Sequence, residues 1–296
     1  MTPRLYHSND TLGLPTEMLA KIFLAGIQDQ SDFDARNEKH WGTLCSHVCK
    51  RWRNLAIQTP ELWSQIICTH PMEPQLWKLW IKRCHRGPLD IIIMLKKESG
   101  DLYDLDNNFQ RSRGLSTAVL DLITPHIHRW HSLRLEIDFQ PVLVQLWSQL
   151  LSAMQPSHCA PTLESVVFAC VESSYWDTVI FPSSFPEVMP AIKEVVISAL
   201  RVDWWKSIPY FTGLVHLKLE GTNVTDHVLK DILLYSPALK SLYLKGPLED
   251  PLPNTEVPLA LHHLMELCIE EVRVTTALII TTYFRVPILV SDVSLS

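Results

Sequence analysis

The sequence predicts an α/β protein in which a small N-terminal helical module precedes an irregular solenoid of parallel strands with helices. Two patterns predict this: an amphipathic helical segment near the N-terminus, and an apolar-x-x-apolar-x-apolar pattern that recurs through the second half of the chain. Hydrophobic residues make up 47% of the 296 residues, which is enough for packed cores. We expect the helical module at residues 1–67 with its core at 12–64, a connecting segment at 68–125, and the repeat region at 126–296.

The first helix is predicted to begin at Pro15. Proline has no N–H to lose in the first helical turn, and Glu17 lies near the positive end of the helix dipole. An apolar stripe follows, made of Met18, Leu19, Ile22 and Phe23. We expect this helix to end between residues 26 and 29, and the polar residues 29–40 to form a loop.

The segment from Trp41 to Ala56 is predicted to be one amphipathic helix. Its apolar residues recur at helical spacing and form one wide face, which consists of Trp41, Leu44, Cys45, Val48, Cys49, Trp52, Leu55 and Ala56. Thr59-Pro60-Glu61 then predicts an N-cap and a short helical turn. Because helical modules of about fifty residues are marginal alone, we expect this apolar face to dock on the rest of the chain or on another protein.

Three sub-motifs in this region, taken in order, resemble an F-box, in the F-box-like form of large fungal families. They are Leu14-Pro15-x-Glu17-Met18-Leu19-x-x-Ile22-Phe23, Val48-Cys49-Lys50-Arg51-Trp52-Arg53-x-Leu55-Ala56 and Thr59-Pro60-Glu61-Leu62-Trp63. The resemblance implies that the helices bind a Skp-family adaptor, and through it a cullin, in an SCF ubiquitin ligase. The positions that match the usual adaptor-contacting surface are Leu14, Pro15, Leu19, Ile22, Phe23, Val48, Trp52 and Trp63.

Two alternatives to adaptor binding stay open. The apolar residues of these helices could form only the core of a helical domain. In addition, the segment between Phe23 and Val48 is longer than in compact F-boxes, so it could alter or block docking on the adaptor.

The connecting segment is predicted to contain a basic helix, a buried strand and an acidic loop. The helix runs from Gln75 to His85, Gly87-Pro88 ends it, and Leu89 to Leu95 forms the strand before the loop at 101–108. Between residues 41 and 86 there are seven basic and two acidic residues, whereas the whole chain has a net charge of −6. An acidic partner therefore suits this segment, and the mild overall charge gives no sign of nucleic-acid binding.

The recurring apolar pattern predicts seven strands whose starts lie 22 to 33 residues apart. Its members are Trp130/Leu133/Leu135, Leu163/Val166/Phe168, Ile192/Val195/Ile197, Leu214/Leu217/Leu219, Leu239/Leu242/Leu244, Leu264/Leu267/Ile269 and Val290/Val293/Leu295. Helical patterns lie between them, notably from Asp226 to Leu234. This period and strand pattern resemble leucine-rich repeats. The Asn or Cys expected beyond each strand is missing, with Thr222 at one such position, so we expect an irregular array.

An F-box followed by degenerate leucine-rich repeats resembles proteins in which the repeats select the substrate. In this interpretation the side chains between the core positions face the concave surface; the candidates for target contact are Arg134, His216, Lys218, Tyr243 and Glu266, together with Val167, Val196 and Cys268. The surface has mixed charge and no dense arginine cluster, which argues against a reader of phosphorylated targets.

The predicted function is a substrate-recognition subunit of an SCF-type E3 ubiquitin ligase that binds an unknown protein target. One alternative is a repeat scaffold that acts independently of ubiquitin ligase. The alternative for the fold of the repeat region is a generic α/β domain with parallel strands.

The sequence predicts no catalytic residue, no cofactor and no metal. Its nine glycines lie too far apart for the G-x-G-x-x-G, G-x-x-x-x-G-K-[ST] or G-x-S-x-G motifs, which excludes the nucleotide-binding and hydrolase classes that depend on them. The best metal candidate is His126-x-His128-x-x-His131, because residues i and i+2 of a strand point the same way, but no Cys or carboxylate matches its spacing. A metal-dependent enzyme that uses this cluster is the second functional alternative.

The N-terminus and the cysteine content predict a cytoplasmic or nuclear protein. Seven cysteines are an odd number, Met1 to Arg4 do not resemble a secretory leader, and no apolar run is long enough for a membrane span. For the last strand, Val290 to Leu295, we expect either a truncated chain or an exposed edge strand.

Overall fold

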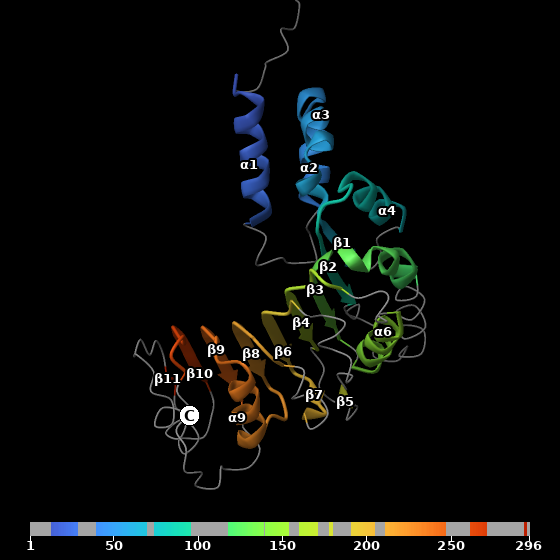
Figure 1. Cartoon of the computed structure of the whole chain (residues 1–296). Helices are drawn as coiled ribbons and strands as arrows, with labels where there is room; N and C mark the ends of the chain where they lie inside the picture. Colours follow the sequence, from blue (N-terminus) through green and yellow to red (C-terminus); the bar gives the residue numbers. More distant parts are fainter. Residues whose placement is uncertain are drawn as a thin grey trace, which may run out of the picture.

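The computed structural model describes residues 13–28, 40–69, 74–95, 118–138, 140–153, 160–170, 178–179, 191–204, 211–246, 261–270 and 293–294. Nine strands form one parallel sheet in which the spatial order follows the chain order, along an arc in Figure 1. They are β1 (Gln65–Thr69), β2 (Leu89–Leu95), β3 (Trp130–Ile137), β4 (Ser165–Ala169), β6 (Glu194–Ser198), β8 (His216–Glu220), β9 (Ser241–Lys245), β10 (Glu266–Glu270) and β11 (Val293–Ser294). A separate pair, β5 (Thr178–Val179) and β7 (Arg201–Val202), is also parallel.

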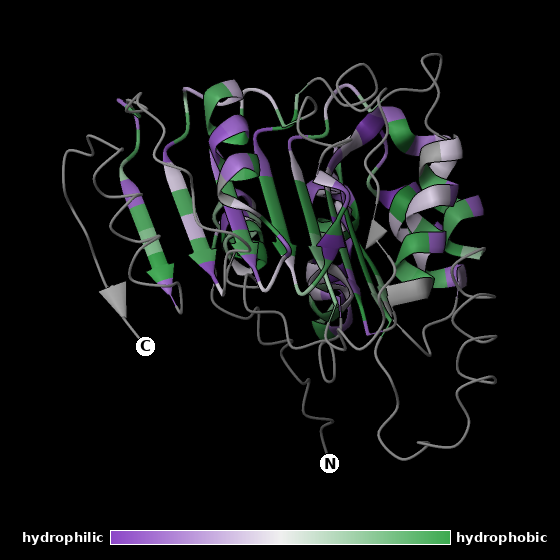
Figure 2. Ribbon diagram, turned by 90° about the horizontal axis from the view of Figure 1, so that it is seen from below, coloured by the Kyte–Doolittle hydropathy of each residue, from purple (hydrophilic) through white to green (hydrophobic). Residues whose placement is uncertain are grey.

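The strands β3, β4, β6, β8, β9 and β10 form where the recurring apolar pattern predicts them. The eighteen predicted core positions of the six repeats between Trp130 and Ile269 are all buried, and Ile192 is the most exposed of them at 7%. Hydrophilic and hydrophobic residues alternate along the strands in Figure 2. This alternation is the pattern of a sheet with one buried and one open face, so the predicted α/β class is confirmed.

Helices cover the buried face of the sheet. The helices α6 (Gln140–Ala153) and α9 (Asp226–Tyr235) lie along the outer side of the arc in Figure 1. The Trp147 ring of α6 meets the Phe168 ring of β4 edge-on, with centroids 4.8 Å apart. The apolar stripe of α9 is buried in the same core, and Thr225 caps this predicted helix by accepting a hydrogen bond from the Val228 N–H.

Four helical pieces make up the N-terminal module: α1 (Thr16–Gln28), α2 (Trp41–Val48), α3 (Lys50–Gln58) and the 3-10 helix η2 (Pro60–Trp63). Trp41 Nε1 donates a hydrogen bond of 2.7 Å to the Phe23 carbonyl and ties α2 to α1. The Phe23 and Trp52 rings are 4.8 Å apart and join α1 to α3. The predicted first helix is confirmed within one or two residues at each end.

The prediction of one helix from Trp41 to Ala56 is wrong, because the chain breaks at Cys49. This residue is extended, with φ −157° and ψ 172°, and its Sγ accepts a hydrogen bond from the Trp52 N–H at the start of α3. Arg53 Nε donates to the Ser46 carbonyl at 2.9 Å, which satisfies an acceptor at the end of α2. The apolar spacing continues across this break, so periodicity alone does not reveal it.

Two smaller predictions need correction. Thr59 precedes η2 as predicted, but its hydroxyl donates to the Leu55 carbonyl at 2.8 Å instead of capping the turn. His126 and His128 lie on the 3-10 helix η3 (Thr124–Arg129), not on a strand, so the argument that their side chains point the same way fails.

The sheet begins earlier than the sequence predicts. The strand β1 was not expected, and it pairs with β2, which in turn pairs with β3. The basic helix is α4 (Pro74–Arg83), and the strand after it matches β2 residue for residue. The predicted boundary at 67/68 therefore lies within β1. The predicted boundary at 125/126 lies between β2 and β3, which pair directly in the same sheet.

Asn223 stands in for the Asn or Cys that the repeat pattern leads us to expect at the position of Thr222. Its side-chain oxygen accepts a hydrogen bond of 2.7 Å from the Val202 N–H, and its amide donates to the Val202 carbonyl at 3.1 Å. The same oxygen accepts from Trp204 Nε1 at 3.2 Å. The expected absence of an Asn at Thr222 is thus compensated by the next residue in the chain.

Several predicted features lie outside the described residues. They are the loop at 29–39, the acidic loop at 101–108, and the residues Val290 and Leu295 of the last repeat. Val293 of that repeat lies in β11, at one edge of the sheet, and pairs with Ile269 of β10.

Candidate functional site

The first candidate site is an apolar surface on the N-terminal helices. Five large apolar side chains of α1, α2 and α3 are exposed by 39% to 56%: Met18, Ile22, Leu44, Val48 and Ile57. Single exposed apolar residues are ordinary, but five of them on three helices that pack against one another mark a surface suited to a protein partner.

The eight residues predicted to contact an adaptor divide into two groups. Pro15, Ile22 and Val48 are exposed, and Leu14 and Trp52 are half-buried. Leu19, Phe23 and Trp63 are buried in the core, so their assignment to the contacting surface needs correction: here they hold the helices together beneath it. Trp63 is held further by a hydrogen bond of 2.7 Å from its Nε1 to the Ala56 carbonyl.

Met18, Leu44 and Ile57 belong to the exposed apolar surface but were not among the predicted contacts. Two of them have a signal in the sequence, because Met18 and Ile22, like Leu44 and Val48, are separated by four residues and lie on the same side of their helix. On α1 and on α2 the apolar stripe is wider than the part that packs into the core. The exposed pairs, Met18 with Ile22 and Leu44 with Val48, are the part that stays uncovered.

A buried histidine joins this module to the sheet. The His40 ring stacks between Trp63 and Trp80, with centroid distances of 5.3 and 4.0 Å. Its Nε2 lies 3.1 Å from the Gln65 carbonyl, and its Nδ1 accepts from the Thr43 N–H, so the neutral ring carries its proton on Nε2. Burial lowers the pKa of His40 from 6.5 to about 4.

The second candidate site is the open face of the sheet, where the strand register brings the predicted target-contacting residues together. Neighbouring strands place Arg134, Val167, Val196, Lys218, Tyr243 and Cys268 in one row. The adjacent row towards the strand starts contains His216 and Glu266. All five residues predicted as target contacts therefore lie on the same face.

A network of charges covers one end of this face. Lys218 Nζ lies 4.5 Å from the centre of the Tyr243 ring and 3.4 Å from a Glu220 oxygen. Lys245 Nζ lies 3.6 Å from Glu220 and 3.7 Å from Glu270. Tyr243 donates a hydrogen bond of 3.0 Å to Glu270, and burial together with this bond raises the pKa of Tyr243 above its usual range.

Three members of this network were missed by the sequence reasoning. Glu220, Lys245 and Glu270 form part of a third row, each two residues beyond a predicted contact. Their signal was the strand period itself, because every second residue of a strand faces the same way.

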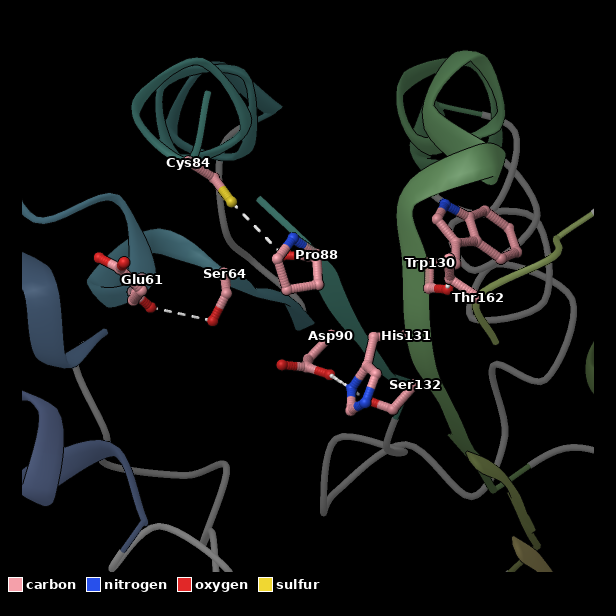
Figure 3. A network of polar contacts seen from close by, with 9 residues as sticks. All are labelled: Glu61, Ser64, Cys84, Pro88, Asp90, Trp130, His131, Ser132 and Thr162. Carbon is pink, nitrogen blue, oxygen red and sulfur yellow. Dashed lines mark hydrogen bonds and ion pairs between the residues drawn. The ribbon is translucent and has the colours of Figure 1, made fainter. Parts of the chain in front are cut away.

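Where β2 meets β3, a carboxylate, an imidazole and a hydroxyl lie close together, but without the order of a catalytic triad (Figure 3). His131 Nδ1 is 3.0 Å from Asp90 Oδ1, and Ser132 Oγ donates to the same oxygen at 2.7 Å. A serine nucleophile is activated by a hydrogen bond to its base, whereas the Ser132 hydroxyl is bound to the carboxylate. This cluster therefore links β2 to β3.

The described residues contain no group of three or more His, Cys, Asp or Glu side chains that could hold a metal ion. Cys45 is buried, and that burial raises the pKa of its thiol to about 11. Among the helices that the structure describes, none has the length and apolar character needed to cross a membrane.

Comparison with known families agrees with the helical surface. The family model described as F-box-like matches residues 11–69, which include all of α1, α2, α3, η2 and β1. The chain thus carries an F-box-like domain at its N-terminal end, as the resemblance of its sub-motifs predicted. No curated protein matches this chain.

Proposed function

We propose that this F-box-like chain is the substrate-recognition subunit of an SCF-type E3 ubiquitin ligase. The N-terminal helices bind a Skp-family adaptor and through it a cullin, and the open face of the sheet holds the target protein. The observation that carries the proposal is the F-box-like match over residues 11–69, within which the five exposed apolar side chains of α1, α2 and α3 lie.

The sheet region serves in this proposal as an irregular leucine-rich-repeat solenoid of fungal type. The strictly sequential strand order and the eighteen buried pattern positions support it, because a solenoid stacks each repeat on its chain neighbours. Such an array offers a long open face for binding a protein. In this proposal the subunit is not an enzyme itself, and it acts in the cytoplasm or nucleus by bringing the target close to the ubiquitin-transferring partner.

A pull-down with purified Skp-family adaptor tests the proposal. The variant Ile22→Asp/Val48→Asp places two carboxylates on the exposed apolar surface without touching the buried Leu19, Phe23 and Trp63. Its affinity for the adaptor should fall at least about tenfold, because each carboxylate would be desolvated in the interface. The matched control is Leu234→Asp, which replaces an equally exposed leucine of α9 and should bind like the wild type.

Two results would overturn the proposal. One is a wild-type chain that does not bind the adaptor at all. The other is equal adaptor binding by the wild type and by Ile22→Asp/Val48→Asp, with thermal unfolding showing that both chains are folded.

A further inference from the structure

The open face of the sheet has an acidic bias. At the outward positions of β2, β3, β4, β6, β8, β9 and β10 there are six carboxylates and three basic side chains. The carboxylates belong to Asp90, Glu136, Glu194, Glu220, Glu266 and Glu270, and the basic groups to Arg134, Lys218 and Lys245. The ratio of acidic to basic side chains on this face is therefore higher than in the whole chain, which has 32 acidic and 26 basic residues.

All three basic side chains are already occupied by carboxylates of the same face. Arg134 forms an ion pair with Glu136. Lys218 pairs with Glu220, and Lys245 bridges Glu220 and Glu270. An acidic or phosphorylated partner would therefore meet neutralised cations next to like charges, which disfavours it.

Two carboxylates of the same face have no such partner. Within the described part of the chain, no ion pair or hydrogen bond involves the side chains of Glu194 on β6 or Glu266 on β10. Both lie in the row nearest the strand starts, where Glu194 pairs in register with His216 and Glu266 with Ser241. The nearby Lys193 is bound to Glu164 at 2.8 Å. Three strand spacings separate the two free carboxylates, or about 14 Å.

An apolar strip lies beside Glu194, on β4 and β6. In the central row, Val167 and Val196 stand side by side between Arg134 and Lys218, and both are half-buried. Ala169 and Ser198, one row further on, add no charge. A side chain placed over this strip would lose water without displacing any ion pair, so the strip suits a bulky apolar residue.

From this charge pattern and the apolar strip we infer that the open face binds a basic segment of a target protein. A bulky apolar side chain of the segment covers Val167 and Val196, and Lys or Arg side chains further along the segment, towards β10, pair with Glu194 and Glu266. The proposed function is the basis for placing this segment in a protein marked for ubiquitin transfer. The binding chemistry is argued from the open face alone.

Selection from a random-peptide phage library on the immobilised full-length chain tests this inference. The enriched peptides should carry a net positive charge and at least one Leu, Phe or Trp. In fluorescence anisotropy their Kd should rise about tenfold in Glu194→Lys/Glu266→Lys, because attraction becomes repulsion, and should also rise with salt. The apolar strip is tested separately by Val196→Asp, which should weaken the same peptides.

The matched control for the charge reversal is Glu61→Lys/Asp231→Lys. It makes the same change of charge on η2 and α9, away from the open face, and its Kd should equal that of the wild type. The inference is overturned if no peptide is enriched, if the enriched peptides are acidic or neutral, or if the reversed variant binds them as well as the wild type. Because the selection needs no adaptor, its outcome is independent of the adaptor pull-down that tests the proposed function.

Discussion

Acid should loosen the junction between the helical module and the sheet through His40. This side chain is 3% exposed, and its ring lies between two tryptophans. Protonation would put a charge into this stack and would remove the acceptor that Nδ1 offers to the Thr43 N–H. Burial holds the pKa of His40 at about 4, so the folded chain resists protonation that the unfolded chain accepts at its ordinary value of 6.5.

The sign of the effect follows from proton linkage. Between pH 6.5 and 4 the unfolded state binds more protons, so the free energy of unfolding rises with pH and falls as the solution is acidified. With these two pKa values, the free energy of unfolding falls by about 2 kcal/mol between roughly pH 7.5 and 5. The loss levels off at about 3 kcal/mol below the folded pKa.

Urea denaturation across this pH range measures the effect. Burial also lowers the pKa of His126, so the wild-type slope contains both histidines. The difference between the wild type and His40→Gln isolates the contribution of His40 to the slope. Equal slopes in the wild type and His40→Gln, or a His40 imidazole that titrates near 6.5 by NMR, would refute the reasoning.

Three further predictions concern stability. Asn223→Ala should cost about 1–3 kcal/mol in urea denaturation, because the backbone groups of Val202 lose their partner; a cost below about 0.5 kcal/mol would contradict this. Gly42→Ala should lower the melting temperature by several degrees, because a Cβ would lie 2.8 Å from the Leu62 carbonyl oxygen. An unchanged melting temperature would show that the backbone shifts to accommodate the methyl group. Lys245→Met should change the free energy of unfolding by less than about 1 kcal/mol, because its ion pairs are partly exposed; a larger loss would reveal a strongly coupled network.

The strand β1 is an element that the apolar pattern alone does not predict. Trp63, Ile66 and Cys68 have the same spacing as the predicted strand cores and are all buried. Trp63 also completes the third F-box sub-motif, so this segment fits two patterns at once. Local spacing cannot assign a residue to one of two overlapping motifs, whereas the pairing of Ile66 with Ile91 decides it.

The candidate sites divide in the same way. The sequence predicts which side chains face away from the sheet core, because strand periodicity is a local property. It does not predict that Lys245 bridges Glu220 and Glu270, since these residues belong to three different strands. Likewise, helical spacing places Leu19 and Ile22 in one apolar stripe, but only packing leaves Ile22 exposed and buries Leu19.

By itself the sequence determined the α/β class, the F-box-like module, the positions of the strands β2, β3, β4, β6, β8, β9 and β10, and the side of the sheet on which each predicted contact lies. These follow from apolar periodicity and ordered motifs, which are written within a few neighbouring residues. The tertiary structure decided the break at Cys49, the place of β1 in the sheet, the burial of His40 and the ion pairs of the open face. Each of these depends on register and packing between residues far apart in the chain, and local chemistry does not encode that information.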